Sequence, residues 1–305
     1  MKRSRLKVSV VTTERNEADT IENFIQGILN QSYGFEKLII CDGNSDDGTI
    51  DLIKKVAKSN PKVKLVIKPG NRSVGRNEAV KASKSEIIAV TDVGTIADKN
   101  WLKYLIEPFE KNPKTMAVGG FFKIKPETFF EKVSATQMLS DHDKIDPKTW
   151  LPSSRSIAFK KEAWAKVGGY PEHTSYNEDT PFDLALKKAG YKFTFAPKAV
   201  VYWRPRPNLK EFFKQYYNYA IGDGLDLIHW PNYLRKILIY FFGTTMVFNG
   251  FWFLALGLAA LYFIRRGRRV FRKYRSINTW ILSPFITITN DLADILGFVK
   301  GVTLR

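Results

Sequence analysis

The chain has few of the residues that build covalent or metal-centred scaffolds. Its 305 residues include one cysteine, Cys41, and three histidines. A single cysteine excludes an intramolecular disulfide framework and a cysteine metal cage, and it is consistent with a reducing compartment. The basic amino end is followed by only a short apolar run, Val8 to Val11, so we expect no signal peptide.

Acidic residues are scarce relative to basic ones: 48 Lys and Arg stand against 30 Asp and Glu, a net charge of +18. The excess is densest in residues 226–305, which hold 11 basic and 3 acidic residues and are also the most apolar part of the chain. Positive charge beside apolar sequence favours anionic lipid headgroups over nucleic acid. We therefore expect a membrane, and no nucleic acid, among the partners.

Residues 7–120 alternate short apolar runs with helical patterns. The runs are rich in Val and Ile, as buried parallel strands are, and they cover 7–12, 37–41, 63–67, 86–91 and 116–120. Helical patterns lie between them at 19–31, 49–58 and 99–111. This alternation predicts an α/β fold with a mostly parallel sheet flanked by helices, whose ligands bind at the carboxyl ends of the strands.

Residues 121–210 are less regular than the segment before them. The patterns predict helices at 126–141, 160–167, 180–189 and 209–221, and a strand at 192–196.

Polar residues gather in two loops that follow the first two strands. The loop from Thr12 to Glu17 carries carboxylates, including Glu14, and backbone N–H groups that can hold a base and a ribose. In the loop from Cys41 to Thr49, Asp42 stands at the strand tip, where it can accept a hydrogen bond from a uracil or guanine N–H. An ordinary polar turn is the alternative interpretation of each loop alone, with Thr49 as the helix cap in the second.

Two later loops carry charge of opposite sign. Arg72 and Arg76 can approach a phosphate, and Gly75 permits a close backbone approach there. Asp92 follows an apolar strand and is well placed to hold a divalent cation, Mg²⁺ or Mn²⁺, that bridges a diphosphate. A loop followed by a solvated helix face is the simpler interpretation of the arginine segment.

Taken together, these loops resemble those of glycosyltransferase family 2, whose nucleotide-sugar domain has the Rossmann-like GT-A fold. The matching pieces are Val8–Glu17, Asp42–Thr49, Gly75–Asn77, Thr91–Gly94, Ser154–Ser156, Gly168–Pro171 and Asn177–Thr180. The resemblance covers roughly residues 7–225. It implies a donor that is a nucleotide-diphosphate-sugar.

The resemblance also implies roles for individual residues. Thr12, Glu14 and Asp42 would contact the nucleotide, and Asp92 would contact the ribose or a metal ion. Asp179, paired with Glu178, would be the general base of an inverting transfer, taking the proton of the acceptor hydroxyl. An acidic cap at a helix start is the alternative interpretation of Glu178 and Asp179.

Two departures from the family pattern bear on the chemistry. The usual Asp-x-Asp is Asp92-Val93-Gly94 here, so one metal ligand is missing, and either metal dependence is lost or another residue substitutes. The Gln-x-x-Arg-Trp of processive synthases is reduced to Gln215-Tyr216-Tyr217-Asn218-Tyr219. We also place Trp203, Arg204 and Gln215 on the acceptor or diphosphate side.

The carboxyl-terminal segment is the most apolar part of the chain. Residues 237–264 carry no charge, 265–275 hold seven basic residues, and 281–299 are again apolar. A single span would place the basic cluster on the far side of a membrane from the preceding domain, against the positive-inside rule, whereas a shallow hairpin that turns near Asn249 and Gly250 returns it to the same side. We favour the hairpin over a span or a buried soluble helix.

We therefore predict a catalytic domain at 1–225 on the cytoplasmic side of a membrane and a membrane-associated segment at 226–305. The expected activity is inverting transfer of a sugar to a hydroxyl acceptor, lipid-linked or a cell-surface glycan precursor. A processive polysaccharide synthase and an inactive membrane-surface binding relative are the alternatives. A sugar-1-phosphate nucleotidyltransferase is disfavoured because Thr12–Glu17 lacks glycine and is acidic.

Overall fold

The computed structural model describes residues 6–139, 145–146 and 149–305. They form two compact units, which we describe separately. The first comprises Met1–Ile124 and His142–Trp203, and the second Lys125–Asp141 and Arg204–Arg305. The first unit ends at Trp203, so residues 204–225 belong to the same unit as the carboxyl-terminal helices. The boundary at residue 225 between a catalytic domain and a membrane-associated segment stays a prediction.

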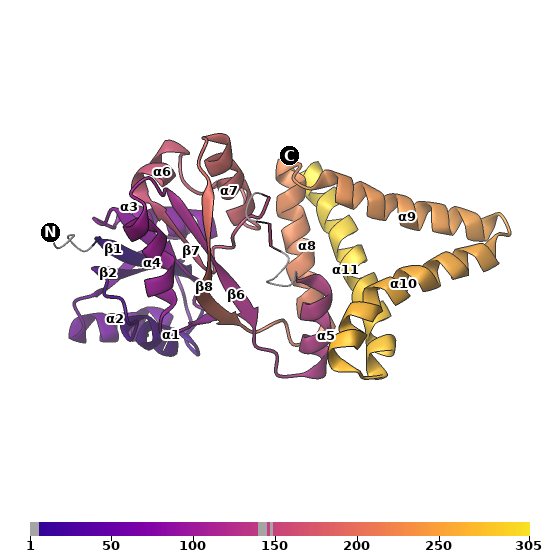
Figure 1. Ribbon diagram of the computed structural model, residues 1–305, viewed down its shortest axis with the longest axis horizontal. Coiled ribbons are helices and arrows are strands. Elements are labelled where there is room, and N and C mark those ends of the chain that lie inside the picture. Colours follow the sequence, from indigo (N-terminus) through magenta and orange to yellow (C-terminus); the bar gives the residue numbers. More distant parts are fainter. Residues whose placement is uncertain (1–5, 140–144, 147–148) are drawn as a thin grey trace. The chain divides into compact units, whose positions relative to one another are not determined.

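The first unit is built on one eight-stranded sheet (Figure 1). Its strands are β1 (Val8–Glu14), β2 (Lys37–Asp42), β3 (Val63–Ile67), β4 (Ile87–Val90), β5 (Thr95–Ala97), β6 (Ala117–Ile124), β7 (Ile157–Lys160) and β8 (Phe193–Trp203), in the order β3-β2-β1-β4-β7-β6-β8-β5. The first four strands in this order are parallel, and β7 is antiparallel to both of its neighbours. The mostly parallel sheet is confirmed, and β5 and β7 are strands that the sequence patterns missed.

Helices cover both faces of this sheet because its strands are apolar on both sides. Val8 and Val10 pack in one core with α1 (Ile21–Leu29), α2 (Thr49–Ser59) and α4 (Trp101–Lys111). Val11 packs in the other core with α3 (Arg72–Lys81), α6 (Lys161–Lys166) and α7 (Asp179–Lys188). Successive strand side chains point to opposite faces, so a continuous apolar run feeds both cores.

Helix α3 lies unusually close to β1. A Cβ added at Gly75 would stand 1.9 Å from the Thr13 hydroxyl oxygen, so only glycine allows this approach. The helix begins after Asn71, whose side chain accepts a hydrogen bond from the Val74 N–H at 3.0 Å. Gly75 therefore serves the packing of α3 on β1, and the phosphate approach predicted for it has no support here.

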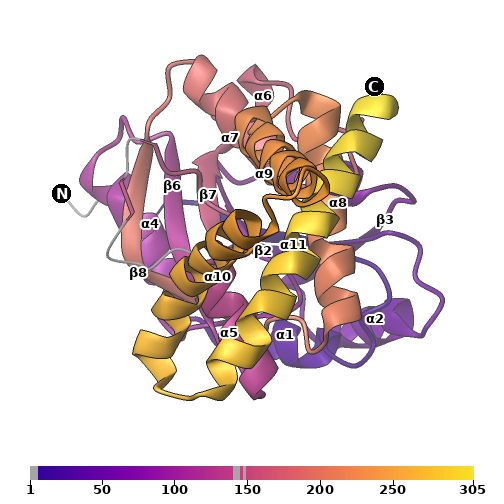
Figure 2. The same ribbon diagram turned by 90° about the vertical axis from the view of Figure 1, so that its right-hand side faces the viewer.

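The second unit is helical. It contains α5 (Phe129–Met138), α8 (Leu209–Asp226), α9 (Trp230–Phe248), α10 (Trp252–Tyr274) and α11 (Asn278–Thr303) (Figures 1 and 2). The backbones of α8 and α11 touch at three glycines, Gly224, Gly297 and Gly301. A Cβ added at any of them would lie 2.2–2.4 Å from a carbonyl oxygen of the facing helix, so only glycine allows this contact. Small residues at such a crossing allow close van der Waals packing.

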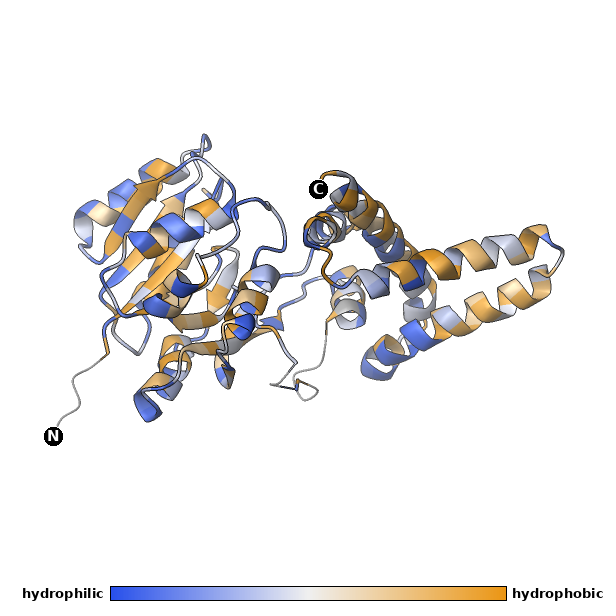
Figure 3. Cartoon of the chain, turned by 90° about the horizontal axis from the view of Figure 1, so that it is seen from above, coloured by the Kyte–Doolittle hydropathy of each residue, from blue (hydrophilic) through white to orange (hydrophobic). Residues whose placement is uncertain are grey.

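The uncharged stretch 237–264 is a helical hairpin. It breaks at Asn249 and Gly250, between α9 and α10, as the hairpin prediction requires. Its apolar residues, orange in Figure 3, have largely exposed side chains: Phe248 is 86% and Phe253 72% accessible. Among the described residues one helix, Asn278–Thr303, is long and apolar enough to cross a membrane, judged by length and composition alone.

Two element boundaries differ from the predictions for physical reasons. Helix α5 starts at Phe129 rather than 126 because Thr128 and Glu131 form a capping box. Strand β8 runs on to Trp203 rather than ending at 196, because it pairs with β6 as far as Ile124 and with β5 along Thr95–Ala97.

We expect Gly75→Ala to destabilise the first unit by about 1–3 kcal/mol, since the added methyl group overpacks the contact with Thr13. Thermal unfolding of the full chain, followed by circular dichroism, measures the change. Gly94→Ala is the matched control, because an added Cβ there meets no atom within 4 Å. Equal midpoints for the two variants would contradict this account of Gly75.

Candidate active site

Two carboxyl groups meet at the carboxyl ends of β1 and β2, where Glu14 and Asp42 are register partners. Both are buried, and three of their oxygens, both of Glu14 and Oδ2 of Asp42, have no hydrogen-bond partner. Burial, reinforced by the neighbouring Asp42, raises the pKa of Glu14 to about 9. Unsatisfied buried acceptors are costly, so this pair is built to receive a ligand that donates hydrogen bonds.

The loops that follow these two strands are joined to each other. The Asn16 amide group exchanges hydrogen bonds with Asp46, at 2.9 and 3.1 Å, and the Asn16 N–H donates to the Ser45 hydroxyl at 2.8 Å. Asp47 accepts from the Ala18 N–H and from Thr49. These contacts give the first two polar loops a fixed shape around the Glu14 and Asp42 carboxyl groups.

A buried arginine links three parts of the site. The guanidinium of Arg76, on α3, pairs with Asp92 at 2.8 Å and with Glu178, and its side chain is 3% exposed. Although burial opposes its charge, Glu178 and Asp92 hold the pKa of Arg76 well above its ordinary value. Arg76 thus anchors the loop after β4 to the start of α7.

Asp92 remains partly open to solvent, its side chain being 33% exposed. Burial alone would raise its pKa, but Arg76, and after it Arg155 and Arg72, keep the pKa of Asp92 below the ordinary value. Asp92 is therefore an ionised carboxylate at the mouth of the site.

Asp179 is the first residue of α7 and follows the anchored Glu178. Its carboxylate accepts a hydrogen bond from the Ser154 N–H at 3.3 Å. Burial, and next the charge of Glu178, raise the pKa of Asp179, while Arg76 and Arg155 limit the rise. A carboxylate with a raised pKa is a stronger base once it is ionised.

Arg155 is a site residue for which the sequence suggested no role. Its guanidinium lies 4.7 Å from the centre of the Trp203 ring and 5.2 Å from that of Phe122. It reaches this edge because β7 is antiparallel to β4, with Ile157 opposite Val90, so the residues before β7 lie beside those after β4. The family resemblance included it within Ser154–Ser156, but its place beside the Asp92 loop follows from an antiparallel pairing that local pattern does not reveal.

The other predicted donor residues are distributed unevenly. Thr12 is buried in β1 with no partner for its hydroxyl group. Arg72 is exposed at the start of α3. Trp203 is opposite Thr95 in the β5–β8 pairing, which places it near the Asp92 loop, with its ring in contact with Arg155 and Phe122.

Arg204 and Gln215 belong to the second unit, where each has partners. Arg204 pairs with Glu127 at 2.7 Å and with the buried Glu131 at 2.8 Å, so its guanidinium supports the start of α5. Gln215 donates to the Tyr219 hydroxyl at 2.8 Å and accepts from Arg206 at 3.3 Å. Their acceptor-side roles stay predictions.

A second set of contacts explains the Asn77 and Gly168–Pro171 pieces of the motif. The Asn77 side chain binds the backbone of Tyr170 through both its amide and its carbonyl and accepts from the Trp164 indole at 3.1 Å. Gly169 has a φ of +83°, and a Cβ there would lie 2.6 Å from Asn77. These residues hold α3 against the loop after α6, which keeps Arg76 in place.

The metal site rests on few ligands. No group of three or more His, Cys, Asp or Glu residues suited to a metal ion occurs among the described residues. Mg²⁺ and Mn²⁺ bound to nucleotides are commonly held by one or two carboxylates together with phosphate oxygens, and the ionised, partly exposed Asp92 fits that donor set. Gly94 faces open space, so a second carboxylate would fit there.

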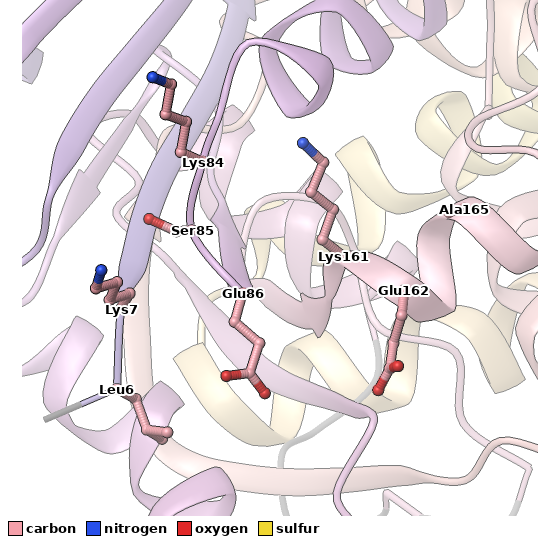
Figure 4. Close-up of a pocket in the computed structure, with 8 residues that line it drawn as sticks. All are labelled: Leu6, Lys7, Lys84, Ser85, Glu86, Lys161, Glu162 and Ala165. Atoms are coloured by element: carbon pink, nitrogen blue, oxygen red, sulfur yellow. The ribbon is translucent and has the colours of Figure 1, made fainter. Parts of the chain in front are cut away.

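A separate surface pocket of about 750 Å³ lies at the amino ends of β1 and β4, beside Lys7, Glu86 and Lys161 (Figure 4). Parallel sheets bind their ligands at the opposite edge, so this pocket is distinct from the carboxylate site. Its lysines stand beside Glu86 and Glu162, which reduces any preference for an anion.

The family model for glycosyl transferase family 2 matches residues 9–174, more than half of the chain. The chain belongs to glycosyltransferase family 2. It is therefore an enzyme that uses a nucleotide-sugar donor, and the cluster around Glu14, Asp42, Arg76, Asp92 and Asp179 lies at the sheet edge where such a donor is expected.

Relatives of this glycosyltransferase make polysaccharides. Succinoglycan biosynthesis protein ExoA of Rhizobium meliloti (strain 1021) is 28% identical over 223 residues, which cover 70% of this chain and 68% of that protein. Poly-beta-1,6-N-acetyl-D-glucosamine synthase of Staphylococcus aureus (strain MSSA476) is 26% identical over 215 residues, which cover 68% of this chain and 52% of the synthase. The chain thus spans about half the length of that synthase.

Solved structures confirm the GT-A fold. The mannosyltransferase PcManGT from Pyrobaculum calidifontis, in complex with GDP-Man and Mn²⁺, has a TM-score of 0.66 at 19% identity and covers 96% of this chain and 88% of its own. GalNAc-T7 with UDP, GalNAc and Mn²⁺ has a TM-score of 0.55 at 15% identity, covering 73% of this chain and 48% of its own.

The raised pKa of Glu14 makes the stability of the transferase depend on pH. The folded state keeps the proton of Glu14 up to about pH 9, whereas the unfolded chain releases it near 4.5, so the free energy of unfolding falls as pH rises between these values. We expect Glu14→Gln to remove this fall and to raise the melting temperature at pH 7.5. Melting curves from pH 5 to 9 test it, and an unchanged pH slope would refute the assignment.

Proposed function

We propose that this glycosyltransferase moves a single sugar, with inversion, from a nucleotide-diphosphate-sugar to a hydroxyl group, with Asp179 as the general base. The observation that carries the proposal is the position of Asp179. It directly follows Glu178, which Arg76 ties to the Asp92 loop, so base and donor-side carboxylate are held in one framework. Burial raises the pKa of Asp179, which makes its carboxylate a stronger base once it is ionised.

In the proposed step the acceptor oxygen attacks the anomeric carbon of the donor sugar while Asp179 takes the hydroxyl proton. The bond between that carbon and the diphosphate oxygen breaks, and the nucleoside diphosphate leaves with the electron pair. Attack from the face opposite the leaving group inverts the anomeric centre. The substitution Asp179→Asn would replace the carboxylate with a neutral amide, which cannot accept the proton.

Several groups are suited to the negative charge of the leaving diphosphate. Arg72 is exposed near Asp92, and Arg155 lies close enough to lower the pKa of that residue. A divalent cation held by Asp92 and the phosphate oxygens would neutralise further charge. The buried Arg76 already serves two carboxylates, so we assign it to positioning the site rather than to the phosphate contact first predicted for it.

We further propose that the acceptor is lipid-linked and that the enzyme works at the cytoplasmic side of a membrane. Support comes from the exposed apolar hairpin of α9 and α10 and from the basic residues 265–275 that follow its apolar part. Uridine and guanosine donors both remain candidates, because the Glu14 and Asp42 pair can accept from either base.

Processive polysaccharide synthesis is the second candidate, because the polymer synthase of Staphylococcus aureus matches the chain over 215 residues. We prefer single transfer since the Gln-x-x-Arg-Trp signature ends here in Asn218 and Tyr219. Incubating membranes that contain the protein with UDP-, GDP- and dTDP-sugars and lipid extract decides between them. Products extended by one sugar support our proposal, and a ladder of long products supports the synthase.

We expect Asp179→Asn to reduce the transfer rate about 10²–10⁴-fold while donor binding is retained, because only the base is lost. The measurements are nucleoside diphosphate release and donor binding by calorimetry. Asp183→Asn is the matched control, because Asp183 is a buried acid one helical turn after Asp179 on α7 and receives the same substitution. Equal rates for the two variants would remove Asp179 from the mechanism.

We expect Gly94→Asp to lower the Mn²⁺ concentration needed for half-maximal activity about ten-fold, because it adds a second carboxylate where space is open. Titrating transfer activity with MnCl₂ measures this shift, and Gly94→Asn serves as the uncharged control. If neither variant responds to Mn²⁺ and the parent enzyme is fully active in chelator, Asp92 acts without a metal.

A further inference from the structure

A large apolar groove lies between the two arms of the hairpin in the second unit. Its volume is about 1030 Å³, and it is lined by side chains of α9 and α10 such as Leu238, Phe242, Leu258 and Leu261. Figure 1 shows α9 and α10 meeting at their shared tip and separating towards α11. The two arms are therefore joined at the tip, and at the other end, the base of the groove, both meet α11.

Two unpaired cations stand at the base of this groove. Arg235 on α9 and Arg265 on α10 both line it, both are exposed, and neither has an ion-pair partner in the described part of the chain. The adjacent Lys236 is neutralised, because it pairs with Asp291 at 2.8 Å and also with Asp294. The groove thus combines an apolar interior with a net positive mouth.

The groove is held in shape by a polar anchor. Tyr240 on α9 and Tyr262 on α10 both donate to Oδ2 of the buried Asp291 on α11, at 3.1 and 2.7 Å. Because one carboxylate binds both arms, their separation is set within the protein. This anchor distinguishes the groove from an accidental gap between loosely packed helices.

The two arginines also lie at matching depths. Arg235 precedes the end of α9 at Phe248 by 13 residues, and Arg265 follows the start of α10 at Trp252 by 13 residues. At 1.5 Å per residue each stands about 20 Å from the tip, less than the roughly 30 Å of a bilayer core. A hairpin inserted from one side would end inside the membrane and leave both arginines at headgroup level.

We infer that the α9–α10 groove is a binding site for a lipid phosphate, with the apolar chain between the arms and the phosphate group at Arg235 and Arg265. The inference rests on the proposed function in that this lipid is the anchor of the acceptor. Charge complementarity selects the phosphate, since guanidinium groups bind it through directed, charge-assisted hydrogen bonds. The groove suits an apolar chain, because apolar side chains of both arms line it and the separation of the arms is fixed at the tip and at Asp291.

Substitution within the groove tests the chain site. Ala259 lines the groove, whereas its neighbour Ala260 is exposed and does not. We expect Ala259→Phe to weaken binding of dioleoyl phosphatidic acid about ten-fold, measured by native mass spectrometry of the full chain in detergent, and Ala260→Phe to leave it unchanged. Both changes add the same apolar surface, so equal affinities of the two variants would overturn the site.

Substitution at the mouth tests the phosphate site with exposed residues that do not threaten folding. Arg235→Gln combined with Arg265→Gln should abolish the preference for phosphatidic acid over dioleoylglycerol, which has the same chains without the phosphate. Arg268→Gln, an exposed cation of α10 that does not line the groove, should keep that preference. A parent protein that binds both lipids equally would refute phosphate selection.

Donor binding, measured on the same preparations, separates this inference from the proposed function. Intact donor binding with no lipid preference would overturn the groove assignment alone. Loss of both donor binding and transfer in the parent protein, with lipid binding retained, would overturn the proposed function while the lipid site stands.

Discussion

The arrangement of the catalytic unit depends on one buried guanidinium. Arg76 joins α3, the loop after β4 and the start of α7 through its pairs with Asp92 and Glu178. A buried charge is tolerated only when it is fully paired, and removing one partner leaves the others uncompensated. The close packing of Gly75 on Thr13 and the contacts of Asn77 with Tyr170 place this arginine, so packed neighbours on α3 position a buried charge.

The parallel half of the sheet and the donor-side loops could be predicted from the sequence because their signals are local. Apolar runs such as 37–41 reveal their strands, and Asp42 stands out as the acid at a strand tip. The antiparallel β7 and the edge strand β5 could not, since three or four residues carry little pattern and their pairing is non-local. Arg155 stood within the matching piece Ser154–Ser156, but its role was missed for that reason. The burial of Arg76 was missed because arginine is ordinarily exposed.

The Glu14 and Asp42 pair shows how function limits stability in this enzyme. Two acids at adjacent strand ends, buried and with unsatisfied oxygens, oppose folding. A sheet optimised for stability alone would have an apolar or hydrogen-bonded residue at one of these positions. Violations of this kind cluster at binding sites, where a ligand supplies the missing hydrogen bonds.

The glycine contacts between α8 and α11 have a consequence for where the second unit can work. Hydrophobic burial stabilises a helix pair in water but loses its driving force once lipid tails replace the water, whereas backbone contact at Gly224, Gly297 and Gly301 acts through van der Waals attraction in either solvent. This part of the α8–α11 contact therefore does not depend on water as the solvent. Under the proposed membrane association, these backbone contacts would hold α8 against α11 in water and in lipid alike.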